Sequence, residues 1–412
     1  MATLLYETAL LLYTAVAFVL SLFQDKPRKW IAGRNRWQRD LAAIDPGPRI
    51  WFHCASVGEF EQARPVIEII KQTRPDVRVV VTFFSPSGFE SPKPKDIADA
   101  VTYLPTDFRR NARRFVTILK PKVAVFVKYE LWYNHLIELQ KNGIPTLLIS
   151  AYFPDWHWLF RWPGKLLIKR LRSFEKIFVQ DQLSAELLQK HGVDQTIVAG
   201  DTRHDRVLNA REEKLPLPEV ERWVGESPVL VIGSNWPADD RVILDTLVDY
   251  KDDLKIIVAP HQITDSQFNT WKNCFGDRMV KWSHGLKSLN ARVSVLWVDE
   301  IGLLARLYRL ATVAYVGGGF GANVHNTLEA AVYGVPVIIG PNNRRFQEIQ
   351  ELKKLGICIE IGDSEMFARV LEKSLIDTEF RREVAGKAEL YFNTHRGATD
   401  KIASYLMGLI DD

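Results

Sequence analysis

A glutamate stands in a short turn between a buried strand and a helix. The stretch WFHCASVGEFEQARPVIEII (residues 51–70) reads as strand, turn and helix, and Glu59 follows Ser56, Val57 and Gly58 at the end of the turn. Gly, Asn and Ser alone are enough to build such a turn. A carboxylate at this position therefore has one of two roles: a charge that favours the helix N-terminus, or a general base that removes a proton from a substrate.

Two further ionisable residues stand at the ends of predicted strands. Glu130 ends the β-branched stretch VAVFVKYE, and on its own it is typical of a strand-end salt-bridge residue. His53 directly precedes the turn that carries Glu59, and it reads as an orienting or packed histidine, or as a second base.

A glycine-rich loop occurs late in the chain. The stretch YVGGGFGANVHNTLEAAVYGVPVIIGP (315–341) reads as strand, glycine loop, helix and strand. Glycines let a backbone approach a phosphate, and a helix starting at about Asn326 would offer free N–H groups and the positive end of its dipole. Glu329, one turn into that helix, either accepts hydrogen bonds from a ribose diol or simply favours the helix N-terminus.

The same loop satisfies the dinucleotide fingerprint G-x-G-x-x-G/A through Gly317, Gly319 and Ala322. That fingerprint requires an acidic residue at the end of the next strand, where it holds a ribose. The next strand instead ends in Gly-Pro-Asn-Asn (340–343). The missing acid argues against a dehydrogenase.

These residues need a scaffold of parallel strands, and the sequence predicts two sets of them. Short β-branched stretches alternate with longer amphipathic ones, which is typical of βα units. The charged, proline-broken stretch at 209–223 separates the two sets, and residues 363–410 read as helices. The predicted strands are 49–53, 77–84, 100–105, 123–130, 145–151 and 176–181, then 228–234, 254–260, 293–299, 313–319, 336–341 and 356–361.

The length agrees with this division. One core rarely grows beyond roughly 250–300 residues, so 412 residues favour two domains. We therefore expect an α/β protein with two doubly wound sheets in tandem. In such sheets ligands bind beyond the carboxyl ends of the strands, which is where the residues described above fall.

Composition narrows the possible partners. A net charge of +4 is too small to indicate nucleic acid, and 47% hydrophobic with 25% charged residues is ordinary for a globular protein. The three cysteines, Cys54, Cys274 and Cys358, are far apart and predict neither a disulfide framework nor a zinc site. This usage fits a reducing compartment.

The N-terminal residues predict contact with a membrane. Residues 3–23 are apolar with Glu7 as their only charge, and six basic residues without an acidic one follow between residues 26 and 39. The apolar stretch barely reaches the roughly 20 residues that a span requires, so it either crosses the bilayer or lies on it as an interfacial helix. The basic residues would keep the remainder on the cytoplasmic side. Trp156, Trp158 and Trp162 lie among basic residues and suit either a membrane surface or packing.

Several motifs together resemble those of a known family. IWFHCASVGEFEQARPVI, VTFFSPSGFE, YLPTDFRRNARRF, KYELWYN, GDTRHDRV and VGGGFGANVHNTLEAAVYGVPVIIGPNNRRFQEIQEL occur in the order seen in 3-deoxy-D-manno-octulosonic acid (Kdo) transferases. These enzymes move Kdo from CMP-Kdo to a lipid A precursor. The resemblance covers about residues 26–400 and implies a GT-B fold, in which two Rossmann-like domains face each other across a cleft.

The resemblance implies a role for each domain and each motif. Residues 26–208 would bind the acceptor and 209–412 would bind the CMP sugar, although the last helices could pack back on the first domain. Residues 1–25, from their own apolar and basic pattern, are expected to anchor the chain to the bacterial inner membrane with both domains on its cytoplasmic face. Glu59 matches the catalytic base, while Glu130 and Arg203 match residues that support the transition state. The implied substrate-binding residues are Ser56, Gly58, Gly233, Ser234, Pro260, His261, Ile301, Gly302, Leu303, Asn326, Thr327, Leu328 and Glu329.

The donor positions also depart from the family pattern. His261 stands where an arginine is usual, Thr327 stands where a proline is usual, and Ile301-Gly302-Leu303 replaces a Met-Gly-Glu loop. The resemblance implies no cofactor and no metal. Two other functions stay open at this point: a GT-B glycosyltransferase that uses a UDP sugar, and a membrane-tethered nucleotide-binding protein without catalytic activity.

Overall fold

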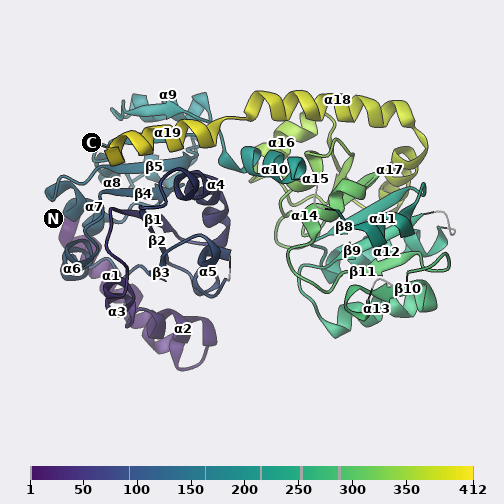
Figure 1. Cartoon of the computed structure of the whole chain (residues 1–412), viewed down its shortest axis with the longest axis horizontal. Helices are drawn as coiled ribbons and strands as arrows, with labels where there is room; N and C mark the ends of the chain where they lie inside the picture. Colours follow the sequence, from purple (N-terminus) through teal and green to yellow (C-terminus); the bar gives the residue numbers. More distant parts are fainter. Residues whose placement is uncertain are drawn as a thin grey trace. The chain divides into compact units, whose positions relative to one another are not determined.

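The computed structural model describes residues 2–91, 93–162, 164–213, 216–250, 254–285 and 289–411. The chain divides into two compact units (Figure 1). The first unit comprises Met1–Asp205 and His395–Asp412, and the second comprises Arg206–Thr394. The division falls close to the boundary predicted after residue 208, and the last helix belongs to the first unit.

The first unit contains a seven-stranded parallel sheet with the order β3-β2-β1-β4-β5-β6-β7. This order reverses between β1 and β4, which creates the switch point at which doubly wound sheets bind ligands. The strands are β1 (Arg49–Cys54), β2 (Arg78–Phe83), β3 (Ala100–Tyr103), β4 (Val123–Val127), β5 (Thr146–Ala151), β6 (Lys176–Val179) and β7 (Thr196–Val198).

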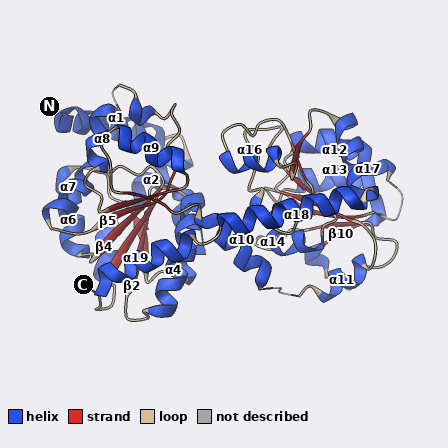
Figure 2. Ribbon diagram, turned by 90° about the horizontal axis from the view of Figure 1, so that it is seen from above, coloured by secondary structure: helices blue, strands red, loops and turns tan. Residues whose placement is uncertain are grey.

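Helices cover both faces of this sheet (Figure 2). Because successive strand residues point to opposite faces, Ile50 and Phe52 pack under α4 and α19, while Trp51 packs on the side of α6 and α7. The helices of this unit are α1 (Ala2–Ser21), α2 (Asp25–Gly33), α3 (Trp37–Ala42), α4 (Val57–Thr73), α5 (Pro86–Glu90), α6 (Arg109–Leu119), α7 (Tyr133–Lys141), α8 (Lys165–Leu171), α9 (Gln182–Lys190) and α19 (Ala398–Asp411).

Helix α1 packs along the first unit through its polar and aromatic residues. The hydroxyl of Tyr6 donates to Asp107 at 2.7 Å, and Glu7, the single charge of this stretch, accepts a hydrogen bond from the N–H of Arg109 where α6 begins. Large apolar residues of α1 are exposed, among them Leu12 and Val19. Among the described residues, none of the helices combines the length and the apolar content that crossing a bilayer requires.

The second unit repeats the architecture with the strand order β10-β11-β9-β8-β12-β13-β14, again entirely parallel. Its switch point lies between β8 and β12. The strands are β8 (Val229–Gly233), β9 (Lys255–Ala259), β10 (Met279–Lys281), β11 (Val295–Trp297), β12 (Val313–Val316), β13 (Val337–Ile339) and β14 (Cys358–Glu360).

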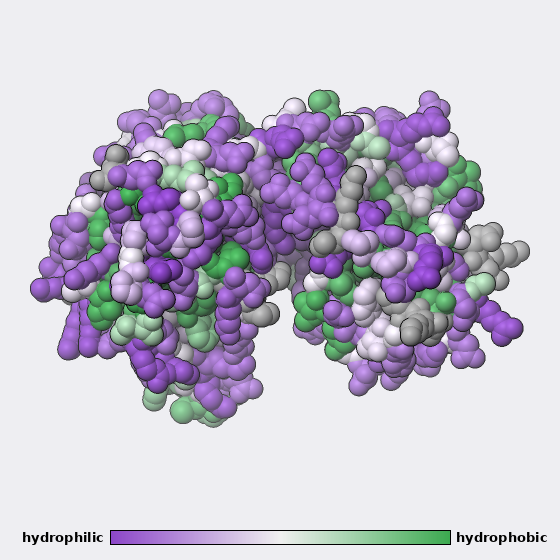
Figure 3. Space-filling model, viewed as in Figure 1, coloured by the Kyte–Doolittle hydropathy of each residue, from purple (hydrophilic) through white to green (hydrophobic). Residues whose placement is uncertain are grey.

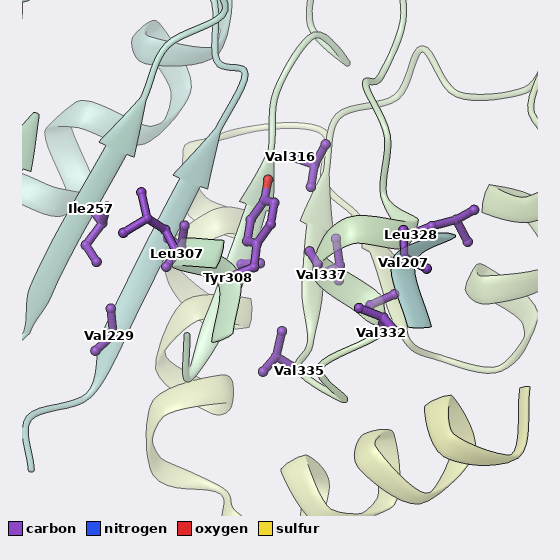
Figure 4. Packing of buried hydrophobic residues seen from close by; sticks show 14 of the residues in the cluster. Val207, Val229, Ile257, Leu307, Tyr308, Val316, Leu328, Val332, Val335 and Val337 are labelled. Carbon is purple, nitrogen blue, oxygen red and sulfur yellow. The ribbon is translucent and has the colours of Figure 1, made fainter. Parts of the chain in front are cut away.

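Two hydrophobic clusters cover the two faces of the second sheet, and Figure 4 shows the cluster that contains Tyr308. Helix α10 (Thr202–Glu212) begins in the first unit and continues into the second. The helices of this unit are α11 (Pro218–Val224), α12 (Pro237–Asp249), α13 (Asp265–Phe275), α14 (Leu304–Leu307), α15 (Leu328–Ala331), α16 (Gln347–Lys354), α17 (Ser364–Ile376) and α18 (Thr378–His395).

The predicted α/β fold with two Rossmann-like sheets is confirmed, and each predicted stretch contains a strand. Two strands were not predicted, β7 and β10. Both have three residues and both lie at the edge of their sheet.

Candidate active site

The turn after β1 fixes Glu59 through reciprocal capping of α4. Ser56 is the N-cap residue, and its hydroxyl accepts a hydrogen bond from the N–H of Glu59. In return, the Glu59 carboxylate accepts a hydrogen bond from the N–H of Ala55. This Ser-x-x-Glu arrangement is a capping box, shifted by one residue on the return bond. Glu59 therefore does stabilise the helix N-terminus, which was one of its two predicted roles.

The electrostatic environment of Glu59 also gives it the properties of a base. Burial at the switch point disfavours its charged form, and the nearby Glu130 carboxylate adds repulsion, so the pKa of Glu59 rises from 4.5 to about 8. The ammonium group of Lys128 acts in the opposite direction. A carboxylate with a pKa near neutrality is a stronger base than an ordinary glutamate, which suits proton abstraction from a hydroxyl group.

Glu130 is held in place by two ring N–H donors. The indole N–H of Trp132 donates to its carboxylate at 2.7 Å, and Nε2 of His53 lies 3.3 Å from the same oxygen. The side chain of Glu130 is 17% exposed, whereas His53 is fully buried. His53 is thus an orienting residue and not a second exposed base.

A buried chain of hydrogen bonds sets the tautomer of His53. Its Nδ1 lies 2.9 Å from the hydroxyl of Thr82, which is directly opposite on β2 and also accepts the indole N–H of Trp51 at 2.8 Å. Burial lowers the pKa of His53, so the ring is neutral. With the Nε2–H directed at the carboxylate, Nδ1 accepts from Thr82, and the chain runs from Trp51 through Thr82 and His53 to Glu130.

Arg203, on α10, is connected through Asp201 to α4, the helix that carries Glu59. Its guanidinium pairs with Asp201 at 2.7 Å, and Asp201 also accepts from the side chain of Gln62, one turn beyond Glu59 on α4. Burial alone would raise the pKa of Asp201, but the guanidinium outweighs it and holds that pKa well below its usual range. Glu59, Glu130 and Arg203 are therefore all placed in the first unit, as the family pattern implies.

Strained backbone accompanies these strand ends. Lys128, Ser150 and Ser234 have φ values of 62°, 51° and 54°, in the left-handed region that residues with a Cβ rarely adopt. They lie at or near the carboxyl ends of β4, β5 and β8. Such conformations cost of order 1–3 kcal/mol each and gather at functional sites.

In the second unit, two of the predicted residues, Gly233 and Glu329, lie near Tyr308. A Cβ on Gly233 would lie 2.0 Å from the hydroxyl of Tyr308, so this strand end requires glycine for packing. The negative charge of Glu329 adds to the effect of burial in raising the pKa of that tyrosine. The loop with Ile301, Gly302 and Leu303 leads into α14, whose Leu304 also packs close to Gly233.

The glycine loop differs from its predicted role as a phosphate cradle. The N–H groups of Gly318 and Phe320 donate to the buried carboxylate of Asp239 on α12, which also accepts from the hydroxyl of Tyr315. A Cβ on Gly319 would lie 2.6 Å from the backbone of Gly340. The loop therefore uses its glycines for close backbone packing, and its N–H groups bind the carboxylate of Asp239. The sequence did not indicate this role of Asp239.

The helix predicted from Asn326 is also shorter than expected. Helix α15 spans only Leu328–Ala331, so its dipole contributes little. Asn326 accepts from the N–H of Leu328 and donates to Glu329 at 3.1 Å, and Thr327 is buried. The guanidinium of Arg206 lies 3.9 Å from Glu329.

Three rings gather at the switch point of the second sheet. The indole N–H of Trp236 donates to Nε2 of His325 at 3.0 Å, and their planes differ by only 11°, so the two rings lie edge to edge. His261 stacks against both, at 4.5 and 4.2 Å between ring centroids. Because an indole can only donate, the Nε2 of His325 carries no proton. Burial, with the neighbouring His261, lowers the pKa of His325 to about 4.

A pocket of about 490 Å³ adjoins these rings, lined by Trp236, Pro237, Ala238, Gly321, Ala322, Asn323, Val324, His325 and Phe346. Sequence reasoning missed Trp236 and His325. The backbone of His261 is fixed by an N–H bond to Asn235, and the preceding Pro260 follows β9 directly. Ser234 and His261 follow the neighbouring strands β8 and β9, and the ring of His261 stacks on the rings of Trp236 and His325, which line this pocket. No group of three or more potential metal ligands occurs in the part of the chain that the structure describes.

Comparison with known proteins identifies relatives along most of the chain. Residues 32–206 match the family model described as 3-deoxy-D-manno-octulosonic-acid transferase (kdotransferase). The chain is 27% identical over 344 residues to 3-deoxy-D-manno-octulosonic acid transferase of Aquifex aeolicus, covering 81% of this chain and 88% of that protein. It is 26% identical over 408 residues to the Haemophilus influenzae protein of the same name, covering 94% and 93%.

Solved structures show the same architecture at low sequence identity. UDP-GlcNAc 2-epimerase from Neisseria meningitidis superposes with a TM-score of 0.59 at 14% identity, covering 87% of this chain and all of that one. A glycosyltransferase from Rickettsia africae superposes with a TM-score of 0.57 at 12% identity, covering 89% and 100%. These matches bear on the fold alone.

Proposed function

The chain belongs to the 3-deoxy-D-manno-octulosonic acid (Kdo) transferase family, and from this premise we propose that it transfers Kdo from CMP-Kdo to a lipid A precursor. The observation that carries the proposal is the pair of carboxylates, Glu59 and Glu130, at the switch point of the first sheet. A raised pKa at this position favours a catalytic protein over one that only binds a nucleotide, because such shifts gather at functional sites.

In the proposed reaction, the ionised Glu59 takes the proton from an acceptor hydroxyl. The hydroxyl oxygen forms a bond to the anomeric carbon of Kdo, while the bond from that carbon to the phosphate oxygen breaks and CMP leaves with the electron pair. One base on the acceptor side, without a nucleophilic carboxylate, corresponds to direct displacement with inversion. Glu130 orients the reacting groups, and Arg203 stabilises negative charge that develops on the phosphate or the Kdo carboxylate.

We assign donor binding to the second unit. Ser234 lies two residues before Trp236, and His261, which follows Pro260, stacks on that indole. The loop at 301–303 leads into α14, and Glu329 lies close enough to Tyr308 to raise the pKa of that tyrosine. His261 replaces an arginine of the family pattern and is exposed, so it would contact a phosphate more weakly than a guanidinium. Binding of the donor by these residues does not require a metal ion.

Product analysis tests the proposed function. Incubation of the protein with CMP-Kdo and a tetraacylated lipid A precursor should yield a Kdo-bearing lipid, detected by mass spectrometry, with release of CMP. CMP should also raise the melting temperature of the protein more than UMP does. If UMP protects better and no Kdo-lipid forms, a glycosyltransferase that uses a UDP sugar is the correct function.

The hydrogen-bond chain behind Glu130 predicts a specific loss of activity. Thr82→Val removes the hydroxyl that fixes His53, leaves two buried ring nitrogens without a partner, and should destabilise the fold by about 1–3 kcal/mol while lowering kcat. Thr82→Ser keeps the hydroxyl but loses a buried methyl group, so it should lose stability without losing kcat. Thermal unfolding and transfer rates measured on both variants provide the check. If Thr82→Val and Thr82→Ser have equal kcat values, the hydrogen bonds from Trp51 through Thr82 and His53 do not position Glu130 for the reaction.

We also propose that the protein acts at the cytoplasmic surface of the bacterial inner membrane. Leu12 of α1 is 65% exposed and Phe23, in the turn after α1, is 79% exposed. Trp156, Trp158 and Trp162 are exposed as well. Figure 3 shows one face of the molecule, which is largely hydrophilic with scattered hydrophobic patches. Apolar side chains beside basic ones suit insertion at the level of the lipid headgroups.

Substitution of the exposed face of α1 tests this location. The double variant Leu12→Glu, Val19→Glu should move the protein from sedimented anionic vesicles to the supernatant. Leu183→Glu, which replaces a leucine 73% exposed on α9, is the control and should sediment like the wild type. Undiminished sedimentation of the double variant would exclude α1 as the membrane contact.

A further inference from the structure

We propose that the groove between α1 and the end of β2 binds one fatty acyl chain of the acceptor. This inference rests on the proposed function, because it names the site that holds the lipid part of the acceptor. The groove has a volume of about 370 Å³ and lies within the first unit. Its lining residues include Tyr13, Ala17, Lys26, Trp30, Phe84 and Ser85.

The inner side of the groove is rigidly built. Arg34 is buried and donates to the backbone carbonyls of both Trp30 and Phe84 at 2.9 Å. Its guanidinium also lies over both rings, 3.7 and 4.8 Å from their centroids. Tyr13 of α1 packs against the same two rings. Two aromatic walls held by one buried cation keep the groove open and apolar, which is what a hydrocarbon chain requires.

Contacts made by two groove residues, Phe84 and Ser85, connect the groove wall to the neighbours of the two carboxylates. Phe84 packs against Trp132 at 5.1 Å between ring centroids, and Trp132 donates to Glu130. The N–H of Ser85 donates to the carbonyl of Ala55, whose own N–H donates to Glu59. A lipid whose chain lies in the groove would therefore have its sugar headgroup close to the proposed base.

Charge at the rim agrees with this orientation. Lys26 lines the groove and is exposed, and Lys29 lies on the next turn of α2, 55% exposed and paired with Glu90. Ammonium groups beside an apolar groove match an amphiphile with anionic groups on its head. The groove borders the exposed apolar residues of α1, so a chain could enter it from the membrane surface.

Filling the groove tests the inference. Ala17→Trp places an indole at a lining position, whereas Ala15→Trp places the same group on an exposed position of the same helix outside the lining. With acylated acceptor in mixed micelles of fixed composition, Ala17→Trp should raise KM about tenfold or more, since loss of two buried methylenes already has that effect. Ala15→Trp should match the wild type, and both variants should match it on a water-soluble, fully deacylated acceptor.

A second readout does not depend on transfer. Ala17→Trp should abolish the fluorescence gain of cis-parinaric acid bound to the wild type, and Ala15→Trp should retain it. If the wild type transfers Kdo to neither acceptor but this pattern holds, the proposed function fails and the acyl site stands. The acyl site is overturned if Ala17→Trp and Ala15→Trp behave alike both in transfer and in binding of cis-parinaric acid. It is also overturned if the only effect of Ala17→Trp is weaker sedimentation with vesicles that contain no acceptor, because the groove would then bind a bulk membrane lipid.

Discussion

Replacement of Glu59 by glutamine should lower the rate of Kdo transfer by about 10²–10⁴-fold, the usual contribution of a positioned general base. Glutamine cannot take up the proton of the acceptor hydroxyl. It can still accept the N–H of Ala55, because a capping box works with Glu or Gln. The variant should therefore fold, bind CMP like the wild type, and fail only in the chemical step measured by CMP release.

Glu68→Gln provides the matched control. Glu68 lies on the same helix, is partly exposed and pairs with Arg64. The same chemical change there should leave transfer at the wild-type rate. If Glu59→Gln were as active as Glu68→Gln, proton abstraction by Glu59 would be excluded.

The raised pKa of Glu59 also predicts how stability depends on pH. Below pH 4.5 the carboxyl is protonated in both the folded and the unfolded chain, so it makes no difference. Between 4.5 and about 8 the unfolded chain releases this proton while the folded chain retains it, so the free energy of unfolding falls as pH rises. The melting temperature of Glu59→Gln minus that of the wild type should therefore increase with pH between 4.5 and about 8, and stay constant above that range.

Replacement of Glu130 by glutamine should have the second largest effect. The wild-type rate should rise with pH around a midpoint near 8, since the reaction requires ionised Glu59. Glu130→Gln removes the repulsion that helps raise the pKa of Glu59, so the midpoint should move to lower pH. The maximal rate should fall by about 10²-fold, because a weaker base acts without the charge of Glu130 in the transition state.

The pH profile of kcat separates this mechanism from loss of structure. Glutamine still accepts the N–H of Trp132, so the site should stay formed. A variant that is slower but keeps a midpoint near 8 would show that Glu130 does not act on Glu59.

The strands were predictable because parallel strands buried on both faces are nearly continuous β-branched runs, as in VAVFV of β4. The two missed strands, β7 and β10, lie at sheet edges, where three residues suffice and burial is incomplete. Their sequences TIV and MVK carry too little pattern to stand out from a loop.

The site was predicted less completely, and the reason is distance along the chain. The sequence shows the glycines of the loop at 317–321 but not that Asp239, far earlier, occupies their N–H groups. Likewise, the role of His53 depends on the register that places it opposite Thr82, and neighbouring parallel strands do not reveal their register in sequence. The helix-capping role of Glu59 could be predicted because both of its capping partners lie within four residues of it in the sequence.

The residues that match the family pattern are connected to one another more clearly in the first unit than in the second. Glu59, Glu130 and Arg203 lie within connected hydrogen-bond and charge networks of the first unit. The assignment of the substrate-binding residues in the second unit remains a prediction, and the cluster of Trp236, His261 and His325 is the place to test it.

The left-handed backbone at Lys128, Ser150 and Ser234 has a consequence for engineering. Glycine would relax each position, so a library selected for heat resistance alone should accumulate glycine at these sites. Each glycine would raise the melting temperature but make the end of a strand near the proposed binding sites more flexible. The rate of transfer would fall as thermal stability rises. A selection that scores product as well as survival should leave these three residues untouched.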